Sequence, residues 1–145
     1  MYFTSTALLN PYPTQYKRPS SPLQFSQRLS QDNLRRLDRI KQYYHQIDRN
    51  DVHAILTLFA PNAVYEREGW APLMGINEIA NFFHVKRNLR GRHTLNSIGL
   101  TTESIPYPYA NQSHQVAIMV KGAFTGRHNN QPIRLTFKDL WVFNT

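Results

Sequence analysis

Two polar side chains, those of Asp139 and His93, stand in stretches that alternate as β-strands. Asp139 alternates with Phe137, Trp141 and Phe143, so these four residues share one face of a strand. His93 stands at the start of another strand, and an imidazole is the side chain best suited to exchange protons near neutral pH. The sequence therefore predicts an acid–base role for His93, with an ordinary half-exposed strand histidine as the alternative.

Metal and cofactor chemistry find no support in the pattern. The chain has no cysteine, and no HExxH motif or other metal-ligand spacing joins its remaining histidines. It also lacks a glycine-rich phosphate loop and a nucleophile elbow. We expect no metal and no cofactor. The histidines set aside in this way are His45, His53, His84, His114 and His128.

Length and charge indicate one small basic domain. A chain of 145 residues is close to the usual size of a single domain, and no apolar run reaches the length of about 20 residues that a membrane-spanning helix needs. Residues 1–22 lack the pattern of a secretory signal, so a cytoplasmic location is the default expectation.

The net charge of +8 is concentrated at the N-terminal end, where residues 1–50 hold eight Lys or Arg against three acidic residues. Such an arm can attract an anionic partner or act only as a solvated tail. A second basic run comprises Lys86, Arg87, Arg90 and Arg92, but no RNA-binding signature or interleaved aromatic residues accompany it. We therefore expect no nucleic-acid partner from the sequence.

Helical elements are predicted in the middle of the chain. Residues 1–30 contain four prolines and no apolar period, which predicts a flexible basic arm before a domain at 31–145. From Ser30 to Ile47 apolar residues recur at helical spacing, Asp51 can cap a second helix, and Asn77 can cap a third one. The apolar residues of these three helices are Leu34, Leu37, Ile40, Tyr44 and Ile47, then Val52, Ile55, Leu56 and Phe59, and then Ile79, Phe82 and Phe83.

Strands are predicted between and after these helices. A short strand spans 63–68 and is followed by a loop over 69–75. After Gly91 the apolar period falls to two, which predicts long antiparallel strands over 94–104, 114–125 and 133–143, with Asn129-Asn130 at a hairpin tip. The pattern as a whole predicts an α+β fold.

This order of elements resembles the nuclear transport factor 2-like superfamily, and in particular SnoaL-like proteins and ketosteroid isomerases. The resemblance rests on YYHQIDRNDVHAILTLFAPNAVYE at 43–66, PLMGINEIANFF at 72–83 and FKDLWVF at 137–143. It implies a cone-shaped α+β barrel in which helices pack on a curved antiparallel sheet and enclose a pocket. It also implies a homodimer that forms through the outer face of the sheet.

The resemblance carries two catalytic positions over to this chain. Tyr43 falls on the oxyanion-hole tyrosine of the isomerases, and Asp139 falls on their second, protonated donor. The position of their general base is occupied here by Arg67, which cannot accept a proton near neutral pH. If both faces look inward, Arg67 can form a salt bridge with Asp139, anchor an anionic ligand, or take part in catalysis. Glu66 and Glu68 would point to the other side of the strand.

The resemblance also bears on the pocket and the sheet edge. Family members continue after a motif like 137–143 with one more strand, so this chain is either one strand short, with an open edge, or truncated. The ligand-binding candidates are mostly aromatic, and the alternative is that they only fill the interior. They are Phe59, Tyr65, Arg67, Trp70, Phe82, Phe83 and Trp141, beside the catalytic candidates Tyr43, Asp139 and His93.

Two functions follow from this reading. The first is a domain that binds a hydrophobic small molecule in an internal pocket, with isomerase-, cyclase- or dehydratase-type acid–base activity. The second is a non-catalytic interaction module of the same fold that dimerises through its sheet.

Overall fold

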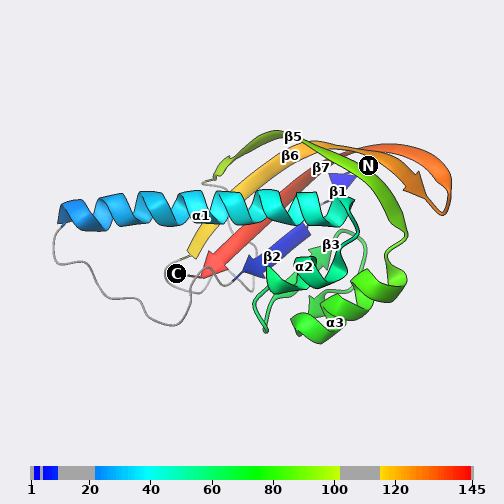
Figure 1. Cartoon of the computed structure of the whole chain (residues 1–145), viewed down its shortest axis with the longest axis horizontal. Helices are drawn as coiled ribbons and strands as arrows, with labels where there is room; N and C mark the ends of the chain where they lie inside the picture. The colour runs from blue at the N-terminus through cyan, green and yellow to red at the C-terminus, as the bar shows by residue number, and fades with distance from the viewer. Residues whose placement is uncertain (1, 4, 10–21, 102–114, 145) are drawn as a thin grey trace.

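A computed structural model describes residues 2–3, 5–9, 22–101 and 115–144. Helices pack on one side of a long, strongly curved sheet, and the long first helix runs across this face of the sheet (Figure 1). The helical elements are α1 (Pro22–Asp48), α2 (Val52–Thr57), α3 (Gly75–Asn81) and the π-helix η1 (Phe82–Lys86). The strands are β1 (Tyr2–Phe3), β2 (Ser5–Leu9), β3 (Val64–Arg67), β4 (Leu73–Met74), β5 (Leu89–Leu100), β6 (Gln115–His128) and β7 (Gln131–Asn144). The predicted α+β class is confirmed.

The sheet is open and mixed rather than a closed antiparallel barrel. Its strands follow the order β4-β3-β2-β7-β6-β5, with β1 paired to β7 beside β2. The pairs β5–β6 and β6–β7 are antiparallel, whereas β1 and β2 both run parallel to β7. The Asn129-Asn130 tip is confirmed, because both residues have positive φ angles of 49° and 64°, as a tight hairpin turn requires.

Of the flexible arm expected over residues 1–30, residues 5–9 form strand β2 and the end from Pro22 belongs to α1, whereas residues 10–21 lie outside the described residues. β2 lies between β7 and β3, and its register joins Thr6 to Leu140 on one side and to Glu66 on the other. The free edge expected on β7 is therefore covered by strands of the same chain (Figure 1). The four prolines, which indicated a flexible segment, all lie outside β2. A strand of five residues is too short for its hydrophobic pattern to be recognised in the sequence.

The first helix begins at Pro22, earlier than Ser30, and its buried face is partly polar. Arg36 and Asp32 are buried one and two turns before Ile40, whereas Leu34 is exposed. Leu34 was expected on the inner face. The buried residues Ile40, Arg36 and Asp32 follow one another at four-residue steps, and Leu34 lies halfway between two of them, on the opposite side of the helix. The guanidinium of Arg36 lies over the ring of Phe143, at 5.9 Å from its centroid.

The second and third helices are close to their predictions. Asp51 caps α2, since its carboxylate accepts a hydrogen bond from the backbone N–H of Ala54 at 3.1 Å. α3 begins at Gly75 rather than after Asn77 and passes directly into η1, in which the N–H of Arg87 donates to the carbonyl of Phe82. The wider π turn brings Phe82 and Phe83 into the core together.

The core lies between the helices and the inner face of the sheet. Cross-strand partners share a face, so the register places Phe124, Gly122, Val120 and Ile118 of β6 on the inner side, opposite the helices. A Cβ at Gly122 would lie 2.7 Å from the Phe137 ring, and this position must stay small for that ring to pack. Within the described residues, no helix is both long and apolar enough to cross a membrane.

Candidate functional site

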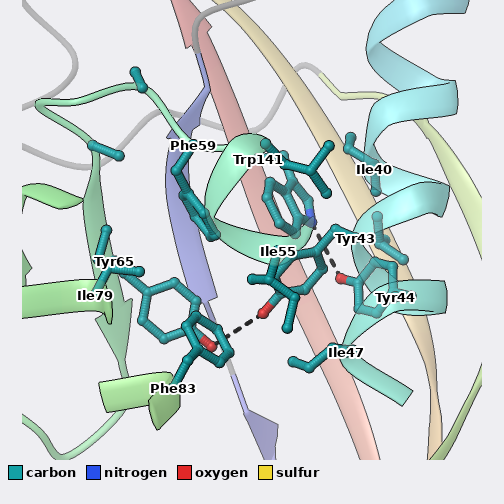
Figure 2. Packing of buried hydrophobic residues seen from close by; sticks show 14 of the residues in the cluster. Ile40, Tyr43, Tyr44, Ile47, Ile55, Phe59, Tyr65, Ile79, Phe83 and Trp141 are labelled. Carbon is teal, nitrogen blue, oxygen red and sulfur yellow. Dashed lines mark hydrogen bonds between the residues drawn. The ribbon is translucent and has the colours of Figure 1, made fainter. Parts of the chain in front are cut away.

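The centre of the interior holds a cluster of aromatic rings. Tyr43 packs edge-on against Trp141 and Phe59, with ring centroids 4.7 Å and 5.9 Å away (Figure 2). Most of the aromatic ligand-binding candidates meet in this cluster and are buried. They are Phe59, Tyr65, Phe82, Phe83 and Trp141.

Trp70 and Arg67 lie apart from this cluster centre. The Trp70 side chain is 66% exposed, so it does not line the interior. Arg67 places its guanidinium 4.1 Å from the ring centroid of Phe82 and 5.2 Å from that of Trp70. Its described contacts are with these two rings and not with Asp139, so the expected salt bridge is not formed. Burial lowers the pKa of Arg67, and its Nε has no hydrogen-bond partner among the described residues.

Asp139 is bound by the neighbour of the predicted tyrosine. The Tyr44 hydroxyl donates a short hydrogen bond to Oδ2 of Asp139. It also accepts a hydrogen bond of 3.1 Å from Nε1 of Trp141 (Figure 2). The hydroxyl of Tyr43 faces that of Tyr65 instead, at 3.4 Å. Both tyrosines fall on the buried side of α1, and the sequence match to Tyr43 alone could not separate them.

His93 is held by a residue that the sequence reading did not single out. Oδ1 of Asp48 lies 2.5 Å from Nδ1 of His93, and Oδ2 accepts the backbone N–H of the same residue at 2.9 Å. Asp48 is the last residue of α1 and His93 lies near the start of β5, so the contact ties the helix to the sheet. Two bonds from one carboxylate fix both the position and the ring orientation of His93.

The Asp48–His93 pair lies beside the Tyr44–Asp139 pair at the margin of the core. The rings of His93 and Tyr44 are 5.3 Å apart, and Phe124 and Phe137 flank the imidazole at 4.8 Å and 5.3 Å. The side chains of His93 and Asp48 are 13% and 22% exposed, so this is the point where the polar groups meet solvent. Within the part of the chain that the structure describes, Nε2 of His93 makes no hydrogen bond, and no three side chains are grouped as metal ligands.

The three buried tyrosines remain protonated well into the alkaline range. Burial is the largest cause that raises the pKa of Tyr43, Tyr44 and Tyr65, and Asp139 adds to the effect on Tyr44. Tyr44 can therefore act as a hydrogen-bond donor to the carboxylate at neutral pH. Arg87 lies near Tyr43 and Tyr65, and burial lowers the pKa of its guanidinium.

These pKa shifts predict a loss of stability at high pH. Since the folded protein favours the neutral phenols, the stabilisation is complete below pH 10, the ordinary tyrosine value, and is lost as the pH rises toward the folded pKa values. We expect the free energy of unfolding to fall by roughly 1.4 kcal/mol per pH unit for each such tyrosine. Denaturant melts at several pH values above 10 measure the slope. The Tyr43→Phe variant should show a shallower one, and an unchanged slope would contradict the assignment.

The comparisons with known proteins agree with this architecture. The model of the nuclear transport factor 2 (NTF2) domain matches residues 38–138. The chain belongs to the NTF2 domain family. The match spans α1 from Asp38 onward and continues into β7, so it includes Tyr43, Tyr44, Asp48, His93 and the greater part of the sheet. No curated protein sequence matches the chain.

Solved structures share the NTF2-like fold at low sequence identity. An NTF2-like protein with a cystatin-like fold from Novosphingobium aromaticivorans is 14% identical, with 88% of this chain and 92% of that chain covered and a TM-score of 0.58. An LEH-like epoxide hydrolase from M. tuberculosis is 8% identical, with 73% and 80% covered and a TM-score of 0.52. At these identities the likeness establishes the fold of this NTF2-like domain and nothing about its reaction.

Proposed function

We propose that this NTF2-like domain binds a hydrophobic small molecule against its aromatic interior and performs acid–base chemistry on it. The observation that carries the proposal is the double hydrogen bond of Asp48 to His93. With Asp48 accepting from Nδ1–H, the lone pair of Nε2 is available, which makes His93 a proton acceptor with a fixed orientation.

The surroundings of His93 favour a carbon acid or an alcohol as the substrate. Phe124 and Phe137 offer apolar faces to the hydrocarbon part of a ligand, and the Tyr44–Asp139 pair lies on the adjoining side. Removal of a proton next to a carbonyl is the common step of isomerase- and cyclase-type reactions, and a dehydratase needs the same base. The structurally similar epoxide hydrolase adds a hydrolase to the reaction types that this fold accommodates.

The test is proton exchange on a panel of enolisable ketones in D2O, followed by NMR. We expect the full chain to catalyse C–H to C–D exchange, and the variant His93→Gln to lose about 10²–10⁴-fold of the rate. Asp48→Asn should retain binding but lower the rate, since the imidazole loses its orientation. His53→Gln, which changes an exposed histidine on α2, is the matched control and should have no effect. Equal rates for His93→Gln and the unchanged protein would refute the role of His93.

A non-catalytic interaction module is the second candidate, and one observation favours it. Tyr65 and Trp141 are buried by direct contacts with other rings, as expected if aromatic residues fill the interior rather than line a binding site. Absence of catalysed exchange, together with absence of a retained ligand in mass spectrometry of the purified protein, would support this interaction module. The homodimer implied by the family resemblance stays a prediction.

A further inference from the structure

The outer face of the sheet gathers basic residues that are scattered in the sequence. Arg90 stands directly opposite Arg127, and Lys121 stands directly opposite Lys138. Cross-strand partners share a face, and this face is the one turned away from the helices. Every Lys and Arg of β5, β6 and β7 lies on it; they are Arg90, Arg92, Lys121, Arg127, Arg134 and Lys138, here called the basic face.

No acidic residue of these three strands shares the basic face. Their single carboxylate, Asp139, points inward to Tyr44. Arg92, Lys121 and Arg134 are exposed, and none of them forms an ion pair or side-chain hydrogen bond with another described residue. Like charges directly opposite each other, as at Arg90 and Arg127, destabilise a sheet, so this arrangement has a cost in the free protein that an anionic partner would relieve.

The dimensions of the basic face suit a regular polyanion. Lys121 and Arg127 stand six positions apart on β6, which is a length of about 20 Å at 3.4 Å per residue. Duplex nucleic acid carries one phosphate per strand for roughly each 3.4 Å of its axis, so about six phosphates of one strand fit along this length. Thr94, Thr125 and Thr136 lie exposed between the charges, where hydroxyl groups can donate to phosphate oxygens.

The basic face has no exposed large apolar or aromatic side chain among the described residues, and this distinguishes between the possible anionic partners. The exposed large hydrophobic residues of the described chain all lie elsewhere; they are Leu34, Trp70, Met74, Val85 and Leu100. A protein partner normally needs an apolar anchor, and a membrane surface needs one to insert. Single-stranded nucleic acid is held by stacking on aromatic rings, which this face also lacks. Of the anionic partners considered, this leaves double-stranded nucleic acid, which a protein can bind through its phosphates alone.

We propose that the basic face of β5–β7 binds the phosphate backbone of a double-stranded nucleic acid without sequence preference. The sequence alone argued against such a partner because no RNA-binding signature or interleaved aromatic residues accompany its basic run, whereas the sheet register brings basic residues of three strands together. The proposal does not depend on the acid–base site, which lies on the opposite side of the sheet.

The experiment titrates a fluorescent DNA duplex of random sequence with the full chain and follows anisotropy at several salt concentrations. We expect binding that weakens with salt, with a slope of log K against log[salt] of about −0.9 for each phosphate contacted. The triple variant Arg92→Gln, Lys121→Gln, Arg134→Gln should bind at least about 10-fold more weakly at low salt. Its slope should be smaller by about 2.7, for three lost contacts.

The matched control removes the same charge from α1. Arg35 and Lys41 are exposed on that helix and Arg49 is exposed directly after its end, and replacement of all three by Gln should leave most of the binding intact. Equal weakening by both triple variants would show that net charge alone attracts the duplex and would overturn the proposal. Absence of duplex binding would also overturn it, as would binding to phosphatidylserine vesicles in preference to the duplex.

Discussion

Replacing Tyr44 by Phe is expected to lower the free energy of unfolding by about 1–3 kcal/mol, the cost of removing one partner from a buried hydrogen-bonding group. Tyr44 is 3% exposed, and its hydroxyl links the carboxylate of Asp139 to the indole of Trp141. The substitution removes a donor from a buried carboxylate and an acceptor from a buried N–H. Denaturant unfolding measures the loss.

The adjacent residue provides the control. Tyr43→Phe removes a hydroxyl that is equally buried but has only the 3.4 Å contact with Tyr65, and we expect a cost below about 1 kcal/mol. In the double variant Tyr44→Phe with Asp139→Leu, much of the loss should be recovered, since no buried charge is left without its donor. If the two Tyr→Phe variants prove equally stable, the hydrogen bond to Asp139 contributes nothing.

Replacing Thr6 by Pro is expected to destabilise the domain by about 3 kcal/mol and to lower its melting temperature by roughly 10 °C. Thr6 lies in β2, between Leu140 of β7 and Glu66 of β3. Proline has no backbone N–H and is tolerated only at sheet edges, whereas β2 has a neighbour on both sides. Thermal unfolding followed by circular dichroism measures the change.

Thr6→Val is the matched control, since valine keeps the N–H and the branched shape and should shift the melting temperature by only a few degrees. A flexible arm, as the prolines of residues 1–30 suggested, would tolerate both substitutions. An unchanged melting temperature for Thr6→Pro would therefore mean that β2 adds nothing to the sheet.

The elements with a clear hydrophobic period could be predicted from the sequence. The three long strands, the Asn129-Asn130 tip and the cap at Asp51 were identified because each depends on local pattern or local hydrogen bonding. β2 could not be found in this way. Its position depends on pairing with residues at the other end of the chain, for which a short segment carries no signal.

Some residues of the candidate site could also be predicted from the sequence, whereas others depend on contacts between distant parts of the chain. His93 was singled out because an imidazole stands at the start of a predicted strand, and Asp139 because the resemblance to the isomerases marked its position. Both lie in the polar cluster beside the core. Asp48 was missed because the last turn of an exposed-looking helix gives no hint of a partner on a strand far along the chain. A salt bridge of Arg67 with Asp139 was one of three alternatives drawn from alternation and the family resemblance, which give the face of a strand but not the direction of a long side chain.

The place of β2 in the sheet has a consequence for the order of folding. The strand that separates β3 from β7 is made early in synthesis, but one of its two neighbours is the last strand of the described chain. β2 cannot be paired on both sides until β7 has left the ribosome. Until then, the backbone groups on the β7-facing edge of β2 have no strand partner. Because contacts between such distant residues are slow to form, we expect β2 to insert late and to limit the folding rate.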